Sequence, residues 1–203
     1  LYFNINREND LNVVTLVGTD GHRLAKFSYN LETDIDEISG VIIPKKTIYE
    51  LSKLLSEIDD NVEILINSNK VIFFIGNIVF ISKLIDGSFP DYKRVIPQNN
   101  NNILKINREI LLSAVDRVST IANDKSPVIK FKLLKDILNL NTVNNESSTA
   151  SEDLKINYNG EEIEIGFNSK YIMDIVNNLE DENITINLKD NSSPIIALEN
   201  SNS

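Results

Sequence analysis

The only histidine of the chain, His22, follows Asp20 by two residues in the segment 19–25, Thr-Asp-Gly-His-Arg-Leu-Ala. A carboxylate near an imidazole can act as an acid–base pair, so a hydrolase that uses Asp20 and His22 is one hypothesis. No serine or cysteine nucleophile motif lies nearby, and Asp-Gly is a common turn dipeptide. We therefore interpret the segment first as a turn, with catalysis as the alternative.

Carboxylates gather at two further places, at Glu57 with Asp59 and Asp60, and at Glu180-Asp181-Glu182. They could bind Ca²⁺, but the ligand spacing of an EF-hand loop is missing, and exposed loops are the preferred interpretation. There is no cysteine, and one histidine among scattered carboxylates makes a poor metal site. We expect no metal and no cofactor.

A second informative segment is 87–97, Gly-Ser-Phe-Pro-Asp-Tyr-Lys-Arg-Val-Ile-Pro. It combines two aromatic residues and two prolines with the adjacent cations Lys93 and Arg94. It could be a packed hinge between domains, the wall of a groove, or both. Like the segment 19–25, it suits a docking surface better than a reaction centre.

Composition limits the number of domains, the kinds of partner and the cellular location that we expect. The 203 residues allow one large domain or two smaller ones. A formal net charge of −10 disfavours a nucleic-acid partner unless cations gather on one face. The absence of cysteine favours a reducing compartment. No apolar run reaches the roughly 18 residues of a membrane span and no signal peptide is recognisable, so we expect a cytoplasmic location.

Three segments repeat one pattern, in which a β-rich run is followed by a breaker or capping residue and then by an amphipathic helix. The helices begin after Pro44, Asn107 and Asn168, at intervals of about 60 residues. Short strands follow each helix, including one at 154–158, and residues 143–152 are expected to form a mobile hairpin connection. The pattern predicts an α+β fold of repeated units. Because residues 1–43 contain strands without a helix, we expect the chain to begin within a unit.

The predicted helices carry cations at their first turns, namely Lys45, Lys46, Arg108 and Lys170. Cations are mildly unfavourable there, because the positive end of the helix dipole lies at the N-terminus. Their recurrence has two interpretations, contact with an external anion or simple solubility.

Segments 19–25 and 87–97 together resemble the signatures of the bacterial sliding clamp family, the β subunit of DNA polymerase III. Residues 41–46, 80–87 and 165–171 add matches in the same order along the chain. The resemblance implies domains built from two helices and two four-stranded sheets. It assigns residues 1–91 to a middle domain without its N-terminal part, and residues 92–203 to a C-terminal domain without its last tail strand.

The resemblance also implies a function without chemistry. Family members pair head to tail as homodimeric rings around duplex DNA, with helices lining the hole, and contact it without sequence readout. The implied DNA-facing residues are Lys45, Lys46, Arg108 and Lys170. Ile121 is the implied ring-interface position, although this shorter chain is not expected to form the native ring. A β-rich adhesin-like repeat is a third, less favoured hypothesis.

The resemblance also implies a peptide-binding groove between the middle and C-terminal domains. In this family, DNA polymerases, the clamp loader and repair proteins dock there through short linear motifs. Transferred to matching positions, the groove comprises Thr19, Gly21, His22, Arg23, Leu24, Pro90, Arg94, Val95, Asn168 and Tyr171, with Ser192 and Pro194 at its edge. Ser126-Pro127 stands where the family often has an aromatic or basic residue, so we expect a weaker wall there.

Overall fold

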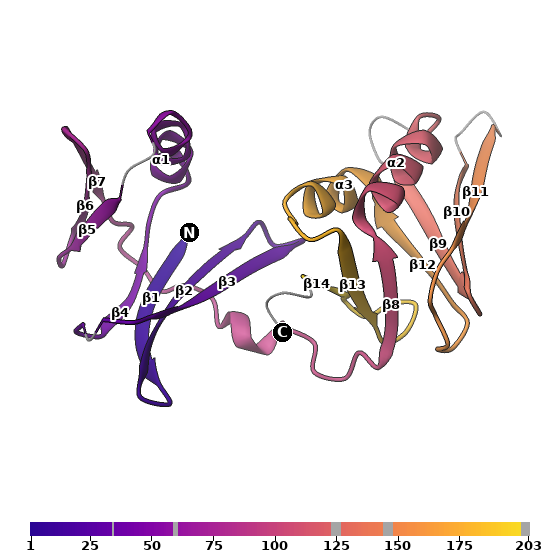
Figure 1. Cartoon of the computed structure of the whole chain (residues 1–203), viewed down its shortest axis with the longest axis horizontal. Helices are drawn as coiled ribbons and strands as arrows, with labels where there is room; N and C mark the ends of the chain where they lie inside the picture. The colour runs from indigo at the N-terminus through magenta and orange to yellow at the C-terminus, as the bar shows by residue number, and fades with distance from the viewer. Residues whose placement is uncertain (34, 59–60, 123–126, 144–147, 200–203) are drawn as a thin grey trace. The chain divides into compact units, whose positions relative to one another are not determined.

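The computed structural model describes residues 1–33, 35–58, 61–122, 127–143 and 148–199 (Figure 1). The chain divides into two compact units, Leu1–Tyr92 and Lys93–Ser203. Each unit combines α-helices with antiparallel sheets, which confirms the predicted α+β class. No helix in the described ranges is long and apolar enough to cross a membrane.

In its described residues, the first unit has one α-helix and two sheets. Its elements are β1 (Tyr2–Glu8), β2 (Leu11–Thr19), β3 (Leu24–Leu31), β4 (Ile38–Ile42), α1 (Lys45–Glu57), β5 (Val62–Ile66), β6 (Lys70–Ile75) and β7 (Ile78–Lys83). One sheet has the strand order β3-β2-β1-β4, and the other has the order β5-β6-β7. All pairings are antiparallel.

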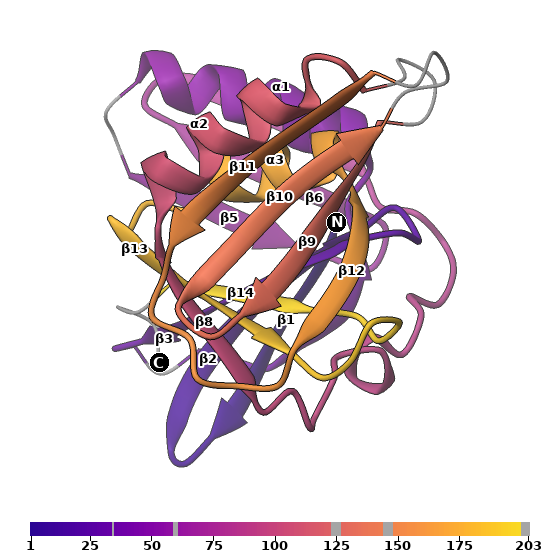
Figure 2. The same ribbon diagram turned by 90° about the vertical axis from the view of Figure 1, so that its right-hand side faces the viewer.

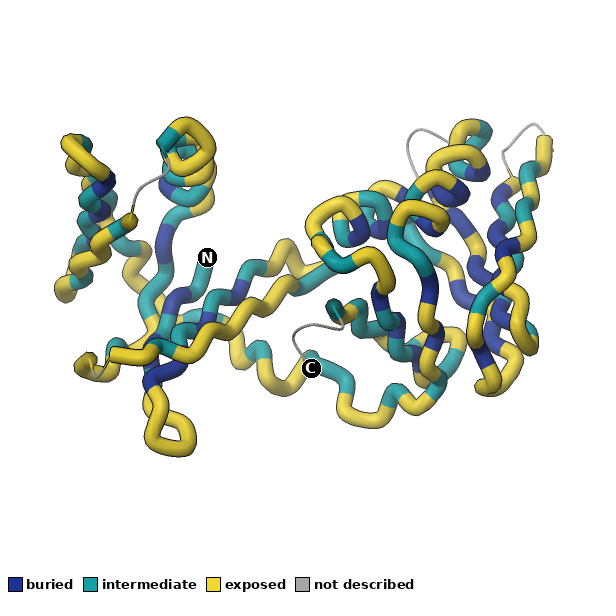
Figure 3. Tube along the Cα trace, viewed as in Figure 1, coloured by how far each residue is buried: buried dark blue, intermediate teal, exposed yellow. Residues whose placement is uncertain are grey.

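The core of this unit follows the two-residue period of its strands. In β6, Val71, Phe73 and Ile75 are buried, whereas the residues between them are only partly covered. The apolar face of α1 packs on the same core (Figure 3). The hydroxyl groups of Thr47 in α1 and Ser82 in β7 lie 2.6 Å apart, which ties the helix to this face of the sheet.

The part of the second unit that the structure describes has two α-helices and two sheets. After the short 3₁₀ helix η1 (Tyr92–Arg94) come β8 (Asn102–Asn107), α2 (Arg108–Ser119), β9 (Val128–Leu134), β10 (Ile137–Val143), β11 (Thr149–Lys155), β12 (Ile163–Asn168), α3 (Ser169–Asn177), β13 (Asn183–Leu188) and β14 (Ile196–Glu199). The sheets have the orders β11-β10-β9-β12 and β14-β13-β8. Helices α2 and α3 contact each other, and α2 covers β9 to β11 (Figure 2).

The predicted helix starts are confirmed. The side-chain oxygen of Asn107 accepts a hydrogen bond from the N–H of Ile110 at 3.1 Å, and that of Asn168 accepts one from the N–H of Lys170 at 3.0 Å. These bonds satisfy N–H groups that have no partner within the helix. Pro44 provides no side-chain cap for α1. Pro44 is still extended, with φ −58° and ψ 144°, but it has no N–H with which to continue the pairing of β4.

The three repeated segments are confirmed as strand followed by helix, but they are not equivalent. Strands β4 and β12 each form an edge of a four-stranded sheet, beside β1 and β9 respectively. Strand β8 belongs to the three-stranded sheet, where it pairs with β13. Helix α1 therefore corresponds to α3, and α2 occupies a different place in its unit.

The predicted bounds of β11 are wrong. The strand begins at Thr149 and ends at Lys155, so residues 149–152 belong to the strand and not to the connection. The strand pairs with β10 as a hairpin, in which Ala150 lies opposite Thr142 and Leu154 lies opposite Leu138. Residues 144–147 of the expected connection lie outside the described residues.

Candidate functional site

The segment 19–25 forms the turn between β2 and β3. Both backbone N–H groups of His22 and Arg23 donate to Oδ1 of Asp20 at 3.0 Å. The Thr19 hydroxyl donates to the carbonyl of Arg23 at 2.8 Å. Gly21 adopts a φ of +87°, which a side chain would strain. The predicted turn is confirmed.

Asp20 organises this turn and is poorly suited to general-base catalysis. The N–H groups of His22 and Arg23 stabilise its charged form and lower its pKa to about 2. Its Oδ2 also accepts a hydrogen bond from Nε of Arg23 at 3.1 Å. A general base needs a pKa near the working pH, so the geometry gives no support to a hydrolase that uses Asp20 and His22.

Leu24 and Pro90 are the apolar groove residues assigned to the first unit. Leu24 opens β3 and is half-buried, whereas Pro90 is exposed. The residues around Pro90 are held by aromatic contacts. The ring of Tyr2 stacks on Phe89 with 5.0 Å between centroids and lies 5.8 Å from the ring of Tyr92. Phe89 and Tyr92 therefore both pack on Tyr2 within the first unit.

In the second unit, Arg94 and Val95 are both exposed, at the end of η1 and just after it. Asn168 caps α3, and Tyr171 lies half-buried in the first turn of that helix. Because the side-chain oxygen of Asn168 already accepts the N–H of Lys170, its structural role is established independently of any ligand.

The predicted edge residues Ser192 and Pro194 belong to a loop built around Asp190. Its carboxylate accepts hydrogen bonds from the N–H groups of Ser192 at 2.9 Å and Ser193 at 2.7 Å, and from both hydroxyl groups. These bonds hold the pKa of Asp190 well below its usual range. The carbonyl of Pro194 accepts from Nδ2 of Asn100 at 2.9 Å. The sequence indicates a turn here, but not the central place of Asp190.

The cations at the helix starts differ in their surroundings. Lys45, Lys46 and Lys170 are exposed, and none of them forms an ion pair with a residue in the described ranges. The side chain of Arg108 is only 22% exposed and pairs with Glu109. The three lysines are therefore better placed than Arg108 to contact an external anion.

Two further predictions concern residues that follow α2. Ile121 is half-buried just beyond the end of this helix, where the N–H of Ala122 donates to the carbonyl of Ser119 at 2.9 Å. Ser126 of the Ser126-Pro127 pair lies outside the described residues. The carbonyl of Pro127 accepts the N–H of Ser169 at 2.8 Å, so Pro127 abuts the start of α3.

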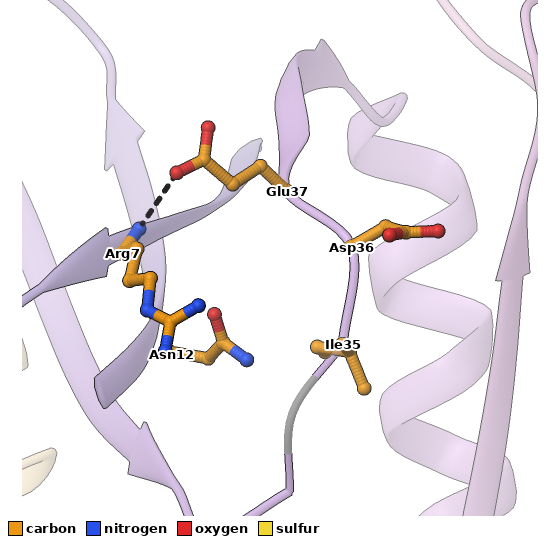
Figure 4. A pocket seen from close by; sticks show the side chains of 5 residues that line it. All are labelled: Arg7, Asn12, Ile35, Asp36 and Glu37. Carbon is orange, nitrogen blue, oxygen red and sulfur yellow. Dashed lines mark hydrogen bonds between the residues drawn. The ribbon is translucent and has the colours of Figure 1, made fainter. Parts of the chain in front are cut away.

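The described residues contain no group of three or more histidine and carboxylate side chains that could hold a metal. Asp59 and Asp60 of the first acidic cluster are not among them. A cavity of about 630 Å³ opens in the first unit, lined by Arg7, Asn12, Ile35, Asp36 and Glu37 (Figure 4). The N–H of Arg7 donates to Oε1 of Glu37 there at 3.3 Å. None of the predicted site residues lines this cavity.

Both units match family models of one protein. Residues 1–91 match the central domain of the DNA polymerase III beta subunit, and residues 93–203 match its C-terminal domain. The Haemophilus influenzae beta sliding clamp is 39% identical over 173 residues, covering 85% of this chain and 47% of the relative. The Caulobacter vibrioides clamp is 35% identical over 199 residues, covering 98% and 54%.

A solved structure agrees with these matches. The DnaN sliding clamp of Bartonella birtlesii bound to griselimycin superposes with a TM-score of 0.93 at 43% identity, covering all of this chain and 54% of that one. The chain thus spans about half the length of the relatives it matches. With both family models matched in order and the fold shared, the chain belongs to the DNA polymerase III beta subunit family, the beta sliding clamps.

Proposed function

We propose that this chain is the peptide-binding part of a sliding clamp, a non-catalytic processivity factor that tethers DNA polymerases and repair proteins to duplex DNA. The observation that carries the proposal is the ordered match of the two units to consecutive clamp domains. In this assignment, residues 1–91 belong to the middle domain and residues 92–203 to the C-terminal domain. We also propose that the protein is located in the cytoplasm.

The proposed binding groove combines two sets of residues. The first unit contributes Thr19, Gly21, His22, Arg23, Leu24 and Pro90, and the second contributes Arg94, Val95, Asn168, Tyr171, Ser192 and Pro194. The structural support is that both turns are held by internal hydrogen bonds, around Asp20 and around Asp190. Such pre-ordered loops lose little conformational entropy when a peptide binds. Exposed Val95 and half-buried Leu24 supply apolar contacts.

The groove is tested by titrating a fluorescent peptide containing Gln-x-x-Leu-Phe into the chain. Loss of a buried charge-assisted or apolar anchor typically costs about 2 kcal/mol, so Arg94→Ala and Leu24→Asp should weaken binding about 30-fold. Lys93→Ala is the matched control, because Lys93 is the neighbouring exposed cation in η1. Equal binding by the wild type, Arg94→Ala and Leu24→Asp would rule out this groove.

The proposed DNA contact uses Lys45, Lys46 and Lys170, with Arg108 as the least accessible member. In an acidic chain, exposed cations at helix starts can meet phosphates while the remaining surface repels DNA. Duplex binding at low ionic strength should therefore weaken in Lys45→Glu and Lys46→Glu. Lys26→Glu, which changes an exposed lysine on β3, is the control. The same loss in all three variants would indicate net charge alone.

The chain covers only about half of the length of its relatives, so the ring of the complete protein is likewise a proposal. We propose that the complete protein forms a homodimeric ring, with Ile121 near the subunit interface. Its partial burial at the end of α2 is compatible with that place. The corresponding Ile121→Asp substitution in the full-length protein should lower the dimer fraction in sedimentation. An unchanged dimer fraction would remove Ile121 from the interface.

A further inference from the structure

The sheet β5-β6-β7 has one face on the core and one face exposed. Val71, Phe73 and Ile75 mark the core side, and Ser82 lies on that side because it bonds to Thr47 of α1. The alternate residues occupy the other face. There, Leu65, Ile72 and Ile81 lie opposite one another across the three strands, as do Phe74 and Val79. These five residues form one apolar cluster, here called the outer-face cluster.

The outer-face cluster is more apolar than a solvated sheet requires. Leu65 is 46% exposed, and Val79 and Ile81 are each 56% exposed. The exposed face of the sheet β11-β10-β9-β12 in the other unit has a polar centre, although Val128, Ile137 and Val143 are exposed at its ends. On that face Lys130 pairs with Glu164 and Lys132 pairs with Glu162, while Asn139 donates to Asp153. Contiguous exposed apolar side chains mark a surface that binds something.

A negative and a positive residue lie at opposite corners of the outer-face cluster. Glu63 on β5 stands opposite Phe74, at one corner of the face. Lys83 on β7 stands opposite Lys70, at the diagonal corner. Within the described part of the chain, neither Glu63 nor Lys83 forms an ion pair. The face thus carries one negative corner, an apolar centre and one positive corner.

We propose that this face binds a second copy of the same chain, with the two sheets packed face to face and their strands crossing at nearly 90°. A two-fold axis that lies between the two sheets, perpendicular to the line from Glu63 to Lys83, exchanges these two corners. Glu63 of one copy then meets Lys83 of the other, twice over, while the apolar clusters meet at the centre. Aligned strands would instead place Glu63 against Val79, so charge complementarity selects the crossed arrangement. The inference is independent of the proposed groove and DNA contact.

The expected association is weak. A standard specific interface buries about 800 Å² on each partner, and five side chains with two charged corners supply less than that. Reversible dimerisation in the range of roughly ten to a few hundred micromolar is therefore expected. Sedimentation velocity over a concentration series of the purified 203-residue chain measures it.

The wild type should shift from one chain toward two as its concentration rises. Ile81→Lys should remain monomeric at every concentration. Val143→Lys is the matched control, since Val143 is 63% exposed on β10 of the other unit, and it should behave like the wild type. Glu63→Lys should weaken dimerisation about tenfold, and the swap Glu63→Lys with Lys83→Glu should restore it. Circular dichroism establishes that each variant is folded.

Three results would overturn the proposal. The first is a wild type that stays monomeric throughout the series. The second is equal dimerisation of Ile81→Lys and Val143→Lys, which would place any interface elsewhere. The third is failure of the charge swap to recover what Glu63→Lys loses, which would contradict the crossed arrangement. Peptide and duplex binding are measured separately, so none of these results bears on the proposed clamp function.

Discussion

Replacing Gly40 with alanine tests how the first unit holds the segment that leads to Arg94. A Cβ atom at Gly40, in β4, would lie 2.1 Å from Cε2 and 2.3 Å from Cζ of Tyr2, so the ring must move. That ring is the one that contacts Phe89 and Tyr92. Each aromatic pair contributes about 0.5–1.5 kcal/mol, and overpacking costs about 1–3 kcal/mol. We expect Gly40→Ala to lower the free energy of unfolding by about 2–6 kcal/mol.

Urea denaturation followed by circular dichroism measures this loss. Gly18→Ala is the matched control, because a Cβ there meets no atom within 4 Å and Gly18 also lies in a strand of the first unit. In a Tyr2→Ala background, Gly40→Ala should cost little more, since the clashing ring is gone. Equal stability of Gly40→Ala and Gly18→Ala would refute the reasoning, as would additive losses in the double variant.

Three further predictions concern single side chains. The pKa of Asp20 lies at about 2, below its usual value of 3.8. Its stabilisation of the turn is therefore complete above about pH 4 and is lost as the pH falls through 2. Carboxyl NMR should show this low titration midpoint, and an ordinary midpoint would contradict the prediction. Tyr158 is 1% exposed and donates to the carbonyl of Glu161, so Tyr158→Phe should lower the unfolding free energy by about 1–2 kcal/mol, whereas Tyr29→Phe on exposed β3 should not. Asn107→Ala should cost about 1 kcal/mol in the same urea assay through loss of the α2 cap, and Asn107→Ser should recover most of it.

The helices and most strands could be predicted because their signals are local. Asn107 and Asn168 cap helices whose apolar residues recur with the helical period, and the structure uses both caps. The apolar run at residues 71–75 predicts a strand, and β6 is one, although only the structure shows that Val71, Phe73 and Ile75 form its buried face. Each of these features depends on residues that lie close together in the sequence.

The features that could not be predicted depend on distant residues. Strand β8 resembles β4 and β12 in sequence, but its pairing with β13, about 80 residues later, places it in a different sheet. Residues 149–152 become a strand because β10 supplies hydrogen-bond partners, not because their own sequence favours one.

The candidate site could be predicted only in part, because its turn depends on local sequence whereas its side-chain contacts depend on the fold. The turn at 19–25 follows from Asp-Gly chemistry, and its resemblance to a clamp motif points to docking. The sequence alone leaves Asp20 open as a catalytic group, because only the folded turn shows its carboxylate accepting two backbone N–H groups. The ion pair of Arg108 with its neighbour Glu109 likewise appears only in the folded helix.

The most direct test of the proposed function is to map the peptide contact on the ¹⁵N-labelled chain. A peptide containing Gln-x-x-Leu-Phe is titrated while the amide resonances are followed by NMR. We expect saturable shifts in both units, at residues 19–24, 94–95, 168–171 and 192–193, with little change around the cavity of Arg7 and Glu37. Shifts confined to one unit, or centred on that cavity, would contradict this expectation.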